Sequence, residues 1–150
     1  YAYTQYNISR TQEFLLTSNE LKTNATSYYN QGENYENSQD YSNAIIMFQE
    51  SNDKVTKALY ADDQASKYAC GVYREYVDND ILLLQKLAKL LEYKIYVNQY
   101  KNNSLNPGQE KVNPSALTPY INNLTTEVAN YKETENQIIN SNIDAFKFLN

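Results

Sequence analysis

The sequence contains no histidine and no tryptophan, and it has one cysteine, three glycines and three prolines in 150 residues. Without histidine, the His-dependent catalytic triads and the di-metal helix motifs that use a histidine are excluded. The single Cys70 excludes an internal disulfide and a cysteine-based zinc site. No glycine-rich phosphate loop occurs. We therefore expect no catalytic residues, no cofactor and no metal, and we predict that the protein is not an enzyme.

Two groups of carboxylates are the remaining candidates for chemistry. Asp62 and Asp63 are adjacent and would point about 100° apart on a helix, which is poor geometry for shared acid–base work. The run Asp78–Asp80 looks slightly like the start of a calcium loop, but the glycine and the closing glutamate of such a loop are missing. We interpret Asp78–Asp80 as a helix cap in front of Ile81.

The net charge of −5 disfavours a nucleic-acid partner, because phosphate binding requires a clustered positive surface. Four lysines do gather on one segment, where they alternate with leucines and indicate the solvated face of a helix: Lys86, Lys89, Lys94 and Lys101.

No apolar run is longer than the four residues Ile81–Leu84, so we predict no membrane span within the sequence. The chain starts at Tyr1 and not at methionine, and we expect an excised segment or a processed product. A membrane anchor outside the segment is compatible with this expectation. For localisation we lean towards an extracytoplasmic or cell-surface position in a prokaryote.

The residues that are present favour helices. Sixteen tyrosines supply much of the apolar mass, and apolar residues recur at helical spacing over long segments with few breakers. We predict one all-α domain, an antiparallel up-down-up-down four-helix bundle with helices at about 4–37, 40–77, 80–101 and 119–149. Two of these boundaries have an alternative. The second helix could instead end at Cys70-Gly71, and the last helix could instead begin at Asn113-Pro114.

The stretch Ser27–Asn52 reads as the tip of a helical hairpin. The first arm carries an aromatic, a glycine and a tyrosine at helical spacing, which are Tyr28, Gly32 and Tyr35. The second arm carries Ala44 and Phe48, and Asp40-Tyr41 lies at the turn between the two arms. This hairpin resembles a single tetratricopeptide repeat, although Gln31, Gln39 and Ser51 depart from the pattern. No second copy follows, so the resemblance implies a local packing solution and not a peptide-binding solenoid.

The third predicted helix carries two apolar seams and should contact more than one neighbour. The simpler interpretation is a helix buried between two bundle partners. The alternative is a partly exposed strip for dimerisation or partner binding. The candidate contact residues are Tyr29 on the hairpin and, along the strip, Leu83, Leu90, Tyr93, Val97 and Tyr100.

These observations predict a non-catalytic helical interaction or structural domain that binds a protein partner or self-associates through the third helix. A second hypothesis is an extracytoplasmic ligand-sensing input domain of a membrane receptor, because the expected layout is similar to that of four-helix sensor domains. No ligand motif matches residue by residue.

Overall fold

The computed structural model describes residues 2–150, with side-chain surroundings from Thr4 onward. All regular structure in this part of the chain is helical, so the all-α prediction is confirmed. The elements are α1 (Ala2–Asn37), α2 (Tyr41–Ser66), α3 (Val72–Lys101), α4 (Pro114–Asn140) and the short 3-10 helix η1 (Ile143–Leu149).

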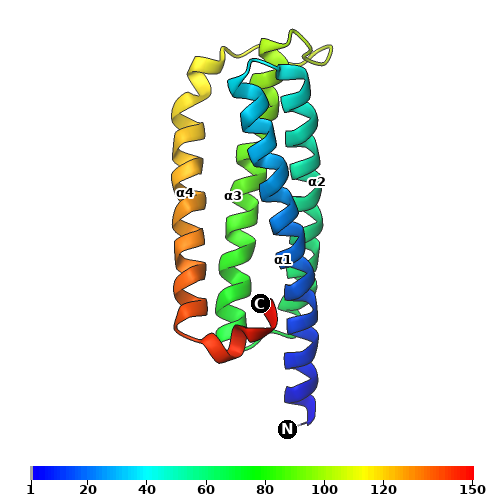
Figure 1. The fold of residues 1–150 in the computed structure, drawn as a ribbon, viewed down its shortest axis with the longest axis vertical. Coiled ribbons are helices and arrows are strands. Elements are labelled where there is room, and N and C mark those ends of the chain that lie inside the picture. Colours follow the sequence, from blue (N-terminus) through cyan, green and yellow to red (C-terminus); the bar gives the residue numbers. More distant parts are fainter. Residues whose placement is uncertain (1) are drawn as a thin grey trace.

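The four long helices lie side by side along the long axis, with their connections at alternating ends (Figure 1). Each long helix packs on its neighbour in the chain: α1 on α2, α2 on α3, and α3 on α4. The backbones of α1 and α4 do not pack along one another. One side of the assembly is therefore closed by side chains alone.

The turn between α1 and α2 follows the predicted hairpin. Asp40 is the N-cap of α2, and its side chain accepts a hydrogen bond from the backbone N–H of Asn43. Phe48 is fully buried and lies directly against Gly32. Further along the same pair of helices, the hydroxyl of Ser51 on α2 donates a hydrogen bond to the backbone carbonyl of Ala25 on α1 at 2.7 Å. Small residues thus let the two helices approach closely, whereas the resemblance to a tetratricopeptide repeat stays a prediction.

Replacement of Gly32 by alanine is expected to destabilise the protein. A Cβ atom at this position would lie 2.6 Å from Cε1 of Phe48, whose ring is buried and cannot move away freely. Overpacking costs about 1–3 kcal/mol, and a gain in helix propensity of about 1 kcal/mol offsets part of that. We expect a net loss of roughly 1 kcal/mol in urea unfolding. Gln31→Ala, at an exposed neighbouring position, should cause no loss, and equal behaviour of both variants would contradict the packing argument.

The boundary between α2 and α3 differs from the prediction. The second helix ends at Ser66 and not near residue 77, and the third begins at Val72 and not at residue 80. Gly71 allows this turn because it adopts a φ of 57°, which side chains with a Cβ rarely adopt. Asp80 lies inside α3 and is fully buried, so its predicted role as a helix cap is wrong.

The last predicted helix is also corrected. It starts at Pro114 with Asn113 as N-cap, which was the alternative boundary, and it leaves Pro119 inside the helix. It ends at Asn140, after which the chain folds back under the helices as η1 (Figure 1). This turn places Phe146 in the core against Tyr73 and Tyr76, a contact that a straight helix running on to residue 149 would lose.

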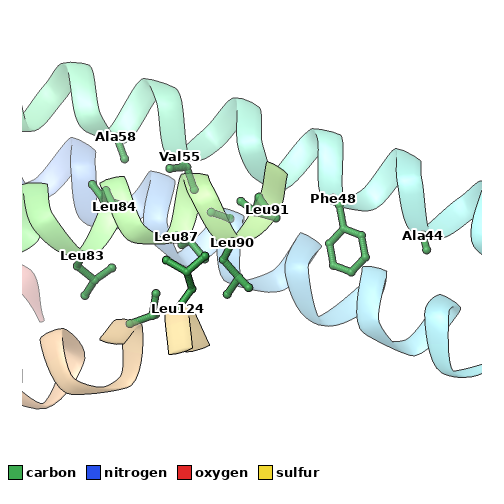
Figure 2. Close-up of a cluster of buried hydrophobic side chains, with 12 residues drawn as sticks. Ala44, Phe48, Val55, Ala58, Leu83, Leu84, Leu87, Leu90, Leu91 and Leu124 are labelled. Carbon is green, nitrogen blue, oxygen red and sulfur yellow. The ribbon is translucent and has the colours of Figure 1, made fainter. Parts of the chain in front are cut away.

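The apolar core runs along α3. In Figure 2, Leu83, Leu87 and Leu90 lie on the side of α3 that faces Leu124 of α4, while Leu84 and Leu91 lie towards α2. A second apolar cluster lies at the end of the helices where η1 packs. It contains Leu15, Ala65, Tyr76, Ile138 and Phe146. Between Ala2 and Asn150, no helix has the length and apolar character needed to cross a membrane.

Candidate functional site: a buried charge cluster below an interhelical cleft

A charged cluster connects all four long helices at the level where α2 and α4 approach their last turns. The Lys22 ammonium of α1 lies 2.7 Å from Oδ1 of Asp80 on α3 and 2.7 Å from Oε1 of Glu135 on α4. Lys22 also donates to the Tyr76 hydroxyl at 3.1 Å, and that hydroxyl donates to Glu135 at 2.9 Å. Asp62 of α2 completes the group beside Asp80. No adjacent pair of helices could form this cluster alone.

The cluster is largely removed from solvent. Asp62 and Asp80 are fully buried, and the side chains of Lys22 and Glu135 are only 14% and 12% exposed. Ser18 adds a hydroxyl that donates to Oδ2 of Asp80 at 3.3 Å. Both oxygens of Asp62 and Oε2 of Glu135 are buried without a hydrogen-bond donor. The cluster therefore has more acceptor oxygens than donors.

The imbalance of charge changes the proton affinity of these groups. Burial raises the pKa of Asp80 to about 7 and that of Glu135 to about 7, and it raises the pKa of Asp62 as well. A protonated Asp62 can donate to Asp80 and so satisfy an oxygen that otherwise has no partner. Burial opposes the charge of Lys22, yet Asp80, Tyr76 and Glu135 together hold the lysine pKa well above its usual value. The pKa values of Asp80 and Glu135 therefore lie near neutrality, so that both carboxyl groups carry protons on the acidic side of neutral pH.

A cleft lies directly above this cluster, where α1 and α4 are held apart. The upper part, of about 210 Å³, has Leu87 and Leu90 of α3 and Tyr29 of α1 among its lining residues, with Val128 on the α4 side. The lower part, of about 150 Å³, reaches Lys22 and Glu135. Both parts share Thr26, Leu87 and Lys132, so they form one continuous feature, which we call the α1–α4 cleft.

A wider groove of about 830 Å³ runs between α2, α3 and the loop that follows α3. Its lining includes amide and aromatic side chains, among them Asn52, Gln85, Tyr93, Tyr96, Gln99 and Gln109. The Tyr96 hydroxyl fixes the loop, because it lies within hydrogen-bond distance of the carbonyls of Glu110 and Val112 and accepts from the N–H of Val112.

Replacement of Tyr96 by phenylalanine is expected to release this loop while leaving the helices folded. The change removes hydrogen bonds whose net worth is about 0.5–1.5 kcal/mol. Amide hydrogen exchange should therefore become faster in residues 103–113 and stay unchanged in α1 and α2. Tyr100→Phe is the matched control, since the Tyr100 ring packs beside Tyr96 at 6.4 Å. If both variants leave loop exchange as it is in the wild type, Tyr96 does not hold the loop.

A second ion pair, nearer the α1–α2 turn, contrasts with the central cluster. Lys94 of α3 lies 2.7 Å from Oε1 of Glu36 and 3.8 Å from Glu33, and Asn98 donates to Oε2 of Glu36. The Lys94 ammonium also lies over the Phe48 ring. Lys94 is therefore buried, contrary to its predicted place on a solvated face. The acidic side chains of this pair are more exposed than those of the central cluster, at 44% for Glu33 and 18% for Glu36.

The predicted contact residues divide into two groups. Leu83, Leu90 and Val97 are buried, so the exposed strip expected along the third helix is not a continuous surface, because α4 covers it. Tyr29, Tyr93 and Tyr100 are half-buried. The structure brings Tyr29 and Leu90 together in the α1–α4 cleft, whereas Tyr93 lies in the wider groove and stacks with Tyr120.

Sequence reasoning missed the charge cluster. A signal was present in the pattern, since Glu135 occupies an apolar seam position and Asp62 interrupts another seam. Charged residues at such positions are almost never fully buried unless they are paired. The pairing itself spans helices far apart in the sequence, and no local pattern reveals it.

Within the described residues, no group of three or more side chains is arranged to hold a metal ion. Comparison with protein-family models, with curated proteins and with solved structures finds no significant match. The interpretation of the cleft and of the charge cluster therefore depends on their geometry alone.

Proposed function

We propose that this chain is a non-catalytic helical interaction domain, an antiparallel up-down-up-down bundle that binds a protein partner or a second copy of itself through the α1–α4 cleft. The observation that carries the proposal is the separation of α1 from α4, which leaves a cleft over Leu87 and Leu90. Two predicted contact residues, Tyr29 and Leu90, line this cleft. Apolar clefts of this kind accept anchoring side chains of a partner.

The charge cluster supports a structural role over a catalytic one. Asp62 and Asp80 are fully buried, and Lys22 is engaged by Asp80, Glu135 and Tyr76 at the same time. A catalytic acid or base must come within hydrogen-bond distance of its substrate. The buried Asp62 and Asp80 cannot meet a substrate in this way, and Lys22 and Glu135, which reach the cleft, are already paired with each other.

Sedimentation velocity over a series of protein concentrations tests the self-association form of the proposal. We expect the average sedimentation coefficient to rise with concentration for the wild type. Ala129→Trp should abolish the rise, because Ala129 lines the cleft and is exposed. Asn130→Trp, at an exposed position that does not line the cleft, is the matched control. A coefficient that is independent of concentration would eliminate self-association as the function.

The second candidate is an extracytoplasmic ligand-sensing domain. It is favoured by the mixed lining of the cleft, where Thr26, Asn30 and Lys132 lie above an apolar floor, as in many small-molecule sites. The two parts of the cleft have volumes of about 210 and 150 Å³, which suits a small ligand. A thermal-shift screen against a metabolite panel tests this candidate, because a ligand that binds the folded state raises its stability. Stabilising compounds should lose their effect in Ala129→Trp and keep it in Asn130→Trp.

A further inference from the structure

The fourth helix is attached to the first by one polar contact. Among residues 4–150, the pair formed by Lys22 and Glu135 is the only hydrogen bond or ion pair that joins α1 and α4. The other polar attachments of α4 to a long helix lead to α3: Tyr76 donates to Glu135, Asn79 donates to the carbonyl of Tyr131, and Lys86 pairs with Glu127. Besides the apolar contacts of the two core clusters, the Lys22–Glu135 pair is therefore the link that closes the α1–α4 cleft.

The groups around Glu135 come from every long helix. They are Lys22 of α1, Asp62 of α2, and Tyr76 and Asp80 of α3. Ser18 of α1 donates to Asp80, and Lys132 lies one turn earlier on α4 beside the same cleft. Only Lys22 brings a positive charge into the buried part. Three carboxyl groups share this one cation, so the closed arrangement is neutral only when two of them carry protons.

Removal of these protons leaves buried negative charge that Lys22 cannot balance. An uncompensated buried charge is costly, and the structure relieves it by returning a carboxylate to water. Asp62 and Asp80 cannot leave, because both are fully buried on helices within the core. Glu135 can, because its side chain is already 12% exposed at the bottom of the cleft, and because α4 packs on α3 and η1 but not along the backbone of α1.

We propose that the charge cluster is a proton-operated latch on α4: with protons on its carboxyl groups it holds Glu135 against Lys22, and when they are lost Glu135 turns to solvent and α4 moves away from α1. Burial raises the pKa of both Asp80 and Glu135 to about 7, so the change falls near neutral pH. The consequence is a cleft that widens on the alkaline side of neutrality. The latch does not require the cleft to bind anything.

Distances between spin labels on α1 and α4 test the latch. In a Cys70→Ser background, labels at Glu20 and Asn136 occupy exposed positions near the two partners of the pair. We expect one narrow distance distribution at pH 5.5 and a longer, broader distribution at pH 8.5, with a midpoint near the pKa of about 7. A distribution that is identical at both pH values would overturn the proposal.

Two variants show whether the charge of Glu135 causes the pH-dependent change in the distance between the labels. Glu135→Gln keeps the size of the side chain but removes its charge, so the labels should keep the short distance at pH 8.5. Glu133→Gln removes an exposed carboxylate from the same helix and should respond like the wild type. An equal loss of response in both variants would show a general charge effect and contradict the latch. If Glu135→Gln does not fold, the pH series on the wild type still decides whether the latch exists. An unchanged distance would contradict the latch but not the proposed binding function, which the sedimentation and thermal-shift experiments test separately.

Discussion

Replacement of Lys22 by methionine is expected to lower the free energy of unfolding by about 3–5 kcal/mol at pH 7, the usual cost of removing one partner from a buried ion pair. Methionine fills a similar volume but leaves Asp62, Asp80 and Glu135 without their only buried cation. These carboxyl groups must then all take up protons for the protein to fold. Urea unfolding followed by circular dichroism measures the effect.

Lys132→Met is the matched control, because Lys132 lines the same cleft but is exposed. It should change stability by less than about 0.5 kcal/mol, as is usual for surface positions. The deficit of Lys22→Met should also shrink as the pH falls towards 4, where the carboxyl groups of the unfolded chain become protonated too. A deficit below about 1 kcal/mol at pH 7 would show that the cluster does not depend on Lys22.

The stability of the wild type is expected to decrease as the pH rises from about 4.5 to about 7. The pKa values of Asp80 and Glu135 are about 7 in the folded protein, against 3.8 and 4.5 for the unperturbed groups. In this window the folded state binds more protons than the unfolded state, so the free energy of unfolding falls with rising pH. Each proton contributes up to about 1.4 kcal/mol per pH unit, and we expect a total fall on the order of 5 kcal/mol from the two groups.

This direction is opposite to ordinary acid denaturation, in which paired carboxylates lose stability as the pH falls. Urea unfolding at pH 4.5, 6, 7 and 8.5 measures the slope. Glu135→Gln should make the slope shallower by one proton, whereas Glu133→Gln should leave it unchanged. Stability that rises steadily from pH 4.5 to pH 7 would mean that the buried carboxyl groups are ionised in the folded state.

The helices were predictable because their signals are local. The spacing of apolar residues and the scarcity of glycine and proline indicated an all-α chain, and Asp40 marked the start of the second helix. The last residue of α3 and the turn after Asn37 were also predicted correctly. Such features depend on periodicity and on capping chemistry within a few residues.

The end of α2 before Gly71 and the burial of Asp80 could not be predicted from local sequence signals. A run of Asp, Asn and Asp in front of Ile81 has the composition of a helix cap, and it is favoured over the alternative stop at Cys70-Gly71, because Gly71 has no capping side chain after it. In the structure Asp80 is buried and pairs with Lys22, which lies on another helix, so it is not available as a cap. The burial of Leu83, Leu90 and Val97 likewise depends on α4 covering α3, which the two seams of the third helix indicated only as one of two alternatives.

The packing of each helix on its chain neighbour has a consequence for the order in which the protein folds. Contacts between α1 and α2, α2 and α3, and α3 and α4 all join adjacent segments, and chains dominated by local contacts fold within microseconds to milliseconds. The Lys22–Glu135 contact joins residues 113 positions apart, so we expect it to form after the transition state. Substitutions in this pair should therefore leave the folding rate nearly unchanged and act by accelerating unfolding.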